Sequence, residues 1–182
     1  MIVLKNFKVK LILAVIVGAI SSLYQLEDSH ELHIAQKNVT LNKNRKEAFE
    51  FISNLTEFPT WFPNINSIRQ IDSGKQMGIG KRFKMSNTYL FGIGESISSI
   101  TVSGHQKPVL FEYLCDNMLM ERNRLEFKLL DKQKTMVSWN IYSRKKSVLF
   151  KYTIGILYKF YYSQLLREAL FSLQLSTNRQ KN

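Results

Sequence analysis

The chain contains few of the residues that build catalytic and metal centres. Only one of its 182 residues is a cysteine, Cys115, and three are histidines. A single cysteine cannot form an intrachain disulfide, and its place in a strand pattern favours a small buried side chain over a nucleophile. The histidines stand near the ends of predicted elements without metal-ligand spacing: His30, His33 and His105. We therefore expect no metal and no cofactor.

Motifs of the major enzyme classes are missing as well. The chain has no HExxH or CxxC motif, no GxSxG nucleophile elbow and no phosphate-binding glycine loop. The pairs Gly78/Gly80 and Gly92/Gly94 are too short to be nucleotide fingerprints, and more simply mark places where a strand bends. The sequence thus predicts no catalytic residues and favours a binding protein over an enzyme.

Acidic residues are scarce relative to basic ones. The chain has 14 Asp and Glu against 26 Lys and Arg, which gives a formal net charge of +12. The basic residues are dispersed, with denser groups at Lys5–Lys10, Lys43–Lys46, Lys81–Lys84 and Arg144–Lys146. Dispersed positive charge suits an anionic membrane surface better than a nucleic acid. We expect no nucleic-acid partner.

Long apolar runs are missing too, with one exception at the N-terminus. An apolar run from Leu11 to Ile20 follows the basic residues Lys5, Lys8 and Lys10, and the segment can be counted from Val9 to Leu26, just before the first acid, Glu27. A basic flank, an apolar centre and a polar exit are typical of a signal anchor or a secretory signal. A membrane span needs about 20 residues, so this segment is just long enough.

We predict that residues 1–30 form a single membrane anchor, which contacts the bilayer through residues 9–26. The basic flank favours a cytoplasmic N-terminus, with the domain on the other side of the membrane. Two alternatives stay open. The small residues of Val17-Gly18-Ala19 also suit a cleavage site, after which the domain would be secreted. Alternatively, the segment is a buried N-terminal helix of the domain.

Residues Glu47–Pro63 combine a short helix with an aromatic turn. Asn42 or Asn44 is expected to cap a helix over Glu47–Ser53. The turn after the helix contains three large rings and two prolines: Phe58, Pro59, Trp61, Phe62 and Pro63. The prolines exclude a long helix here, so we predict a rigid aromatic wedge that closes one end of an apolar cavity.

Most of the remaining domain is predicted to be β-structure. A first strand over Glu31–Leu41 changes its alternation between Ile34 and Val39, which indicates a bulge. Six more strands alternate apolar and polar residues: Asn66–Asp72, Ile79–Ser86, Tyr89–Val102, Val109–Asp116, Met118–Leu130 and Thr135–Tyr142. One apolar face is typical of an antiparallel sheet that is covered on one side.

The last predicted element is a helix over Ser147–Leu175. Its apolar residues recur at helical spacing: Ile154, Leu157, Tyr158, Tyr161, Leu165, Ala169 and Leu173. Lys151, Lys159 and Arg167 make it too polar to span a bilayer. At about 1.5 Å per residue it is long enough to cross the whole sheet. Residues 177–182 are expected to be a flexible tail.

The order of elements and several short phrases resemble one known superfamily. The phrases are KEAFEFISNLTEFPTWFP, GIGKRF from Gly78, and LLREAL from Leu165. They are similar to phrases of the START-like superfamily, also called the polyketide cyclase/dehydrase and lipid-transport (SRPBCC) group. The resemblance implies an α+β helix-grip domain over residues 31–176, in which a curved antiparallel sheet of about seven strands wraps around the long C-terminal helix. The N-terminal hydrophobic segment departs from most small members.

The resemblance also implies an internal pocket for a hydrophobic ligand. The candidate pocket residues are Trp61, Phe62, Phe83, Phe91, Glu95, Tyr113, Trp139, Tyr158 and Tyr161. Each aromatic residue among them could equally be plain core packing. Glu95 is in phase with Phe91 and Ile97, which predicts a carboxylate on the apolar face. Such a group needs a partner, either the polar head of a ligand or a structural arginine.

The predicted function is non-catalytic binding, and possibly transport, of a lipid or other hydrophobic small molecule by a membrane-tethered domain. One alternative is a structural or protein-interaction module whose cavity is filled. Another is an enzyme of the polyketide cyclase/dehydratase kind, which would need paired acid and base groups in the pocket. Cavity volume separates a ligand-binding domain from a filled module.

Overall fold

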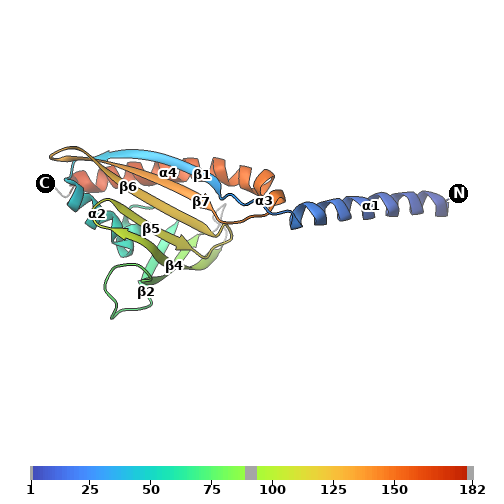
Figure 1. Ribbon diagram of the computed structural model, residues 1–182, viewed down its shortest axis with the longest axis horizontal. Coiled ribbons are helices and arrows are strands. Elements are labelled where there is room, and N and C mark those ends of the chain that lie inside the picture. Colours follow the sequence, from blue (N-terminus) through green and yellow to red (C-terminus); the bar gives the residue numbers. More distant parts are fainter. Residues whose placement is uncertain (1, 89–93, 180–182) are drawn as a thin grey trace.

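The structure is a computed structural model that describes residues 2–88 and 94–179. A long helix, α1 (Ile2–Gln25), projects from one end of the domain (Figure 1). Residues Phe7–Gln25 of this helix are long and apolar enough to cross a membrane, and none of them is buried against the domain. The alternative of a buried N-terminal helix is therefore wrong.

Seven antiparallel strands form one sheet in the order β1-β7-β6-β5-β4-β3-β2. The strands are β1 (Leu32–Leu41), β2 (Ile65–Gln70), β3 (Arg82–Thr88), β4 (Glu95–Gln106), β5 (Leu110–Cys115), β6 (Glu121–Asp131) and β7 (Lys134–Ser143). The predicted bulge is present in β1, where the register shifts between His33 and Ala35. The predicted antiparallel sheet is thus confirmed.

Two short helices follow β1 and two helices end the chain: α2 (Arg45–Ser53), η1 (Leu55–Thr60), α3 (Val148–Tyr152) and α4 (Ile154–Arg179). Asn44 caps α2, because its Oδ1 accepts from the backbone N–H of Glu47 at 2.9 Å. α4 runs along the sheet and packs on β1 (Figure 1). This strand, helix and sheet order confirms the helix-grip fold.

The C-terminal helix is interrupted, which the sequence did not predict. The predicted helix from Ser147 is broken at Thr153, which has φ −120° and ψ −91°. Gly155 lies just after this break, where the backbone comes close to Leu32 of β1. A Cβ at this position would lie 2.6 Å from Leu32 Cδ2 and 3.0 Å from the Phe150 oxygen. The break leaves Leu157 of the predicted apolar stripe 69% exposed. α4 also continues beyond Leu175 to Arg179.

The prediction of which β4 residues face the core is wrong. Ile97 is 64% exposed and Glu95 is exposed, whereas Ile100 and Val102 are buried. The core face is set by pairing with β5, where Ile100 lies opposite Cys115 and Val102 opposite Tyr113. The prediction took its face from Phe91 and Ile97, and Phe91 lies outside the described residues.

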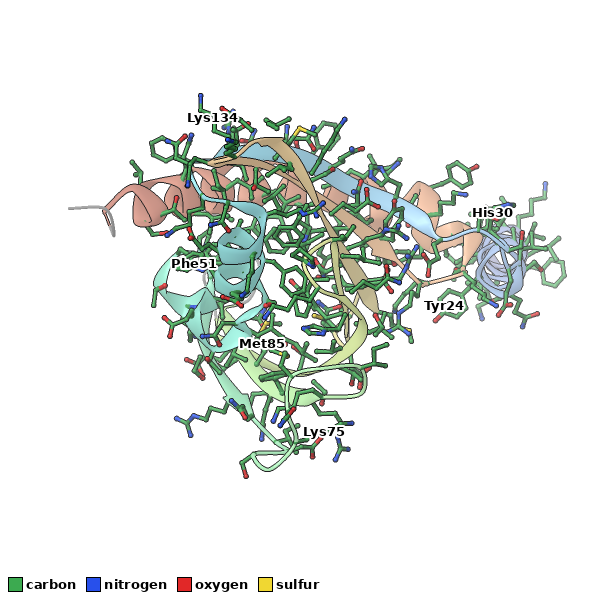
Figure 2. The ribbon with its side chains drawn as sticks, turned by 60° about the vertical axis from the view of Figure 1, so that its left-hand side comes forward. Tyr24, His30, Phe51, Lys75, Met85 and Lys134 are labelled. Carbon is green, nitrogen blue, oxygen red and sulfur yellow. The ribbon has the colours of Figure 1, made fainter. Side chains whose placement is uncertain are left out.

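Side chains fill the space between the sheet and the helices (Figure 2). Large fully buried rings come from α2, η1, β5 and β7: Phe49, Phe58, Phe111 and Trp139. Phe49 is 5.1 Å from Phe127 between ring centroids, and Phe58 is 5.9 Å from Trp139. The aromatic residues of the short helices therefore form the core against the sheet, rather than a loose surface cluster.

Candidate ligand-binding site

A small cavity remains between the sheet, η1 and α4. Its volume is about 60 Å³, and it adjoins a second hollow of about 90 Å³ through shared lining residues. The shared residues are Asn87, Thr88, Asn117, Tyr161 and Tyr162. The apolar side of the first cavity includes Phe58, Phe62, Met85, Ile100, Ile141 and Leu165. Its polar side includes Asn64, Asn87, Asn117, Glu121 and Asn123.

Three larger hollows, of about 540, 440 and 260 Å³, lie elsewhere. The smallest of them lies where α1 meets α3, beside Tyr24 and Phe150. The two largest are shallow depressions among charged side chains, such as Arg124 and Glu126 in one and Glu50 and Lys107 in the other. These residues form exposed ion pairs with one another. Solvated charges of this kind make a poor ligand cavity, so the space beneath α4 is the better candidate.

Glu121 is the buried charged group of the cavity, with 5% of its surface exposed. Its Oε1 accepts from Asn117 Nδ2 at 2.5 Å and from the Tyr162 hydroxyl, and its Oε2 accepts from Asn123 Nδ2 at 3.1 Å. No described Lys, Arg or His forms an ion pair with it. Neutral hydrogen-bond donors therefore compensate the burial of this carboxylate.

The two amides that hold Glu121 have fixed orientations. The Oδ1 of Asn117 accepts from the backbone N–H of Leu119 at 3.1 Å, so its NH2 group must face Glu121. The Oδ1 of Asn123 accepts from the indole N–H of Trp139 at 2.9 Å, and an indole can only donate. Both amides therefore donate to Glu121, and the oxygens of Glu121 serve as acceptors.

Burial and the nearby Glu121 together raise the pKa values of neighbouring side chains. Desolvation, followed by the nearby Glu121, raises the pKa of Tyr162 well above its usual 10.0. Desolvation is also the main cause that raises the pKa of Tyr113 and of the Cys115 thiol. Tyr162 thus stays a hydrogen-bond donor at neutral pH, and Cys115 is confirmed as a buried side chain.

Asn87 contributes an acceptor with no partner. Its Oδ1 is fully buried and has no hydrogen-bond partner among the described residues, and Asn87 lines both hollows. It lies on β3 opposite Ser96 of β4. Unsatisfied buried acceptors are rare in folded proteins, so one that borders a cavity suggests a missing partner in that cavity.

Four of the predicted pocket residues line these hollows. Phe62, Tyr113 and Tyr161 line the first, and Tyr158 and Tyr161 line the second. Three further predicted residues are buried in the core and do not line either hollow: Trp61, Phe83 and Trp139. Phe91 lies outside the described residues.

Glu95 does not belong to the site. It lies on the outer face of the sheet, where it accepts from Asn66 Nδ2 at 3.0 Å and from the Ser86 hydroxyl at 3.3 Å. The predicted carboxylate of the apolar face is instead Glu121. Glu121 and Asn123 share the alternation of the buried residues Leu125 and Phe127 on β6. That alternation was the signal that would have found them.

The aromatic wedge forms one boundary of the cavity. Phe58, Phe62 and Pro63 line the space, while Trp61 lies behind them. Trp61 is 3% exposed, and its ring centroid is 4.6 Å from that of Phe58 and 6.2 Å from that of Trp139. Trp61 therefore supports the wedge from within the core.

Replacing Trp61 with alanine is expected to lower the free energy of unfolding by about 3–5 kcal/mol, because it leaves a large core void. Trp61→Phe keeps a ring and removes an indole N–H that has no partner, so we expect less than half of that loss. Urea unfolding followed by circular dichroism measures both, with exposed Phe171→Ala as control. A Trp61→Ala loss no larger than the control's would show that Trp61 is not core.

Tyr162→Phe removes one donor from Glu121, so we expect a loss of about 1–3 kcal/mol in the free energy of unfolding at pH 7. The pKa of Tyr162 is raised in the folded state. The stabilisation of the fold by Tyr162 is therefore fully present below the unfolded pKa, which is near 10, and is lost as the pH rises further. The variant should therefore lose stability less steeply than the wild type above about pH 10. Exposed Tyr152→Phe is the control, and equal slopes in all three proteins would contradict the assignment.

Comparison with known proteins identifies the fold by structure alone. No protein-family model matches the chain, and the curated proteins contain no match. A START superfamily protein from Mycobacterium smegmatis has a TM-score of 0.63 at 13% identity, covering 81% of this chain and 99% of its own. A protein from Thermus thermophilus has a TM-score of 0.63 at 9% identity, covering 84% and 100%.

An enzyme shares the same architecture. The Zhui aromatase/cyclase from Streptomyces sp. R1128 has a TM-score of 0.57 at 11% identity, covering 84% of this chain and 97% of its own. Structures described as START proteins and as cyclases thus both match. Together with the seven-stranded sheet and α4, these matches show that the chain has the START-like helix-grip fold.

Proposed function

We propose that the domain binds a hydrophobic small molecule or lipid without transforming it, in the space beneath α4. The observation that carries the proposal is a cavity with an apolar side and one buried polar cluster around Glu121. Ligand sites commonly combine an apolar lining with a few placed polar groups. The fold shared with START proteins supports the same function.

Chemistry at this site would need more than the cavity offers. Glu121 is the one carboxylate among the described lining residues, and none of them is a histidine, lysine or arginine. Its oxygens are occupied by three neutral donors, so a paired acid and base is not formed. A binding role therefore fits these residues better than a cyclase or dehydratase.

The cavity volume constrains how a ligand enters. The two hollows, about 60 and 90 Å³, are well below the roughly 300–1,000 Å³ of typical ligand pockets. A bound ligand would have to displace side chains at the boundary, and Phe62 and Tyr161 are only partly buried there. The small volume also supports a second candidate function, an interaction module whose core is filled by its own aromatic residues.

Membrane tethering by α1 forms the second part of the proposal. The span lies next to α3, with Asp28 paired to Lys151 and the Val148 N–H donating to the Leu26 oxygen at 3.0 Å. The bond from Lys151 is the main reason that the pKa of Asp28 is lowered to about 2. Tyr24 lies at this junction (Figure 2). A span fixed in this way would hold the domain close to a bilayer.

Apolar side chains are exposed at the same end of the domain. Tyr152, Leu157 and Phe160 are 67%, 69% and 73% exposed on α3 and α4. Exposed aromatic and aliphatic side chains beside a membrane span suit the interfacial region of a bilayer. They therefore support an anchor that is kept, rather than a signal that is removed.

Native mass spectrometry of the full chain, purified in mild detergent from its own membrane fraction, tests both parts. We expect a fraction of the molecules to carry one added apolar compound, and a polypeptide mass near the full 21.3 kDa. Organic extraction of the same sample should release that compound.

Two results would contradict the proposal separately. Ligand-free protein in every preparation, with extracts identical to those of a mock purification, would favour the filled module. A polypeptide mass that lacks the residues up to Ala19 would show a cleaved signal in place of an anchor.

A further inference from the structure

The polar end of the cavity is rich in acceptors. A carboxylate has about four lone-pair positions, and the hydrogen bonds of Glu121 occupy two on Oε1 and one on Oε2. One position on Oε2 is therefore left for a further donor. Asn87 adds its buried Oδ1, which has no partner in the described part of the chain.

The donors of this cluster are already in use. The Tyr162 hydroxyl and the amides of Asn117 and Asn123 all point to Glu121. Their orientations are fixed by Leu119 and Trp139, so neither amide can turn its NH2 group towards a ligand without losing a bond. Around Glu121, the position left for a newcomer is therefore an acceptor, whereas the hydroxyls of Tyr113 and Tyr161, which also line the first hollow, can donate or accept.

The charge of the cavity is opposite to that of the protein. The chain carries a net charge of +12, yet the described residues that line the two hollows include one carboxylate and no cation. An anionic group placed beside Glu121 would be repelled, and the repulsion is stronger in a buried site than in water. A neutral or cationic group would not be repelled by Glu121.

We propose that the site selects amphiphiles whose polar end donates hydrogen bonds and carries no negative charge, namely alcohols or protonated amines rather than carboxylates or phosphates. This proposal rests on the proposed function. The donor group lies against Glu121 and Asn87, and the apolar body lies among Phe62, Met85 and Leu165. The basic surface does not reach the ligand, so it does not select an anion.

The test uses the full chain in phosphatidylcholine vesicles and four compounds with one shared apolar body. They are 4-phenylbutan-1-ol, 4-phenylbutylamine, the methyl ether of the alcohol, and 4-phenylbutyrate. Near pH 7 they present a neutral donor, a cationic donor, an acceptor without a donor, and an anion. Fluorescence of Trp61 and Trp139, the two tryptophans of the chain, reports binding. Protein-free vesicles correct for partitioning into lipid.

We expect the alcohol and the amine to bind at least about tenfold more tightly than the butyrate, with the ether in between. Glu121→Gln keeps the shape of the side chain and removes its charge, so the difference between alcohol and butyrate should shrink about tenfold. Glu126→Gln makes the same change on the exposed face of the same strand and should leave the order intact.

Asn87→Ala provides a second variant if Glu121→Gln fails to fold. It removes an acceptor that has no partner among residues 2–88 and 94–179, so the domain should keep its stability while alcohol binding weakens about fivefold. Butyrate that binds the wild type as tightly as the alcohol would overturn the proposal. Equal binding of all four compounds would overturn it and leave the proposed function standing. If none of the four compounds binds, both this proposal and the proposed function are contradicted.

Discussion

The burial of Glu121 without a cationic partner is the constraint on which the candidate site depends. Isolated carboxylates are costly to bury, and here Asn117, Asn123 and Tyr162 supply the compensating donors. Each donor is held by the fold, since Trp139 of β7 orients Asn123 and α4 carries Tyr162. The network therefore joins sheet and helix at one point. It also leaves one acceptor position of Glu121 free for a ligand.

The remaining geometry follows from how one helix covers a curved sheet. Gly155 lets the start of α4 approach Leu32 of β1 closely. At the other side, Phe58 and Phe62 of the aromatic wedge fill much of the groove, with Trp61 packed behind them. What is left is a cavity of about 60 Å³ at the polar cluster. Ligand binding thus depends on movement of the boundary side chains, whereas the polar end is already organised.

The fold could be predicted from the sequence because its signals are local. The cap at Asn44 and the alternation along β5 and β7 each follow from neighbouring residues. The break at Thr153 was not predicted; it precedes Gly155, where the chain comes close to Leu32 of β1. The site was harder, because Glu95 was assigned to the apolar face from its phase with Phe91 and Ile97, whereas pairing of Ile100 with β5 decides the face. Glu121 was missed although it alternates in phase with the core.

The central claim is that a ligand reaches the polar cluster beneath α4. Nuclear magnetic resonance of the full chain labelled with 15N-tryptophan, in bicelles, tests it directly, because the two indole N–H groups have different surroundings. The Trp139 indole donates to Asn123, which donates to Glu121, whereas the Trp61 indole has no partner among the residues that the structure describes. Titration with 4-phenylbutan-1-ol should move the Trp139 resonance saturably and the Trp61 resonance much less. An unmoved Trp139 resonance at saturating alcohol would contradict the account.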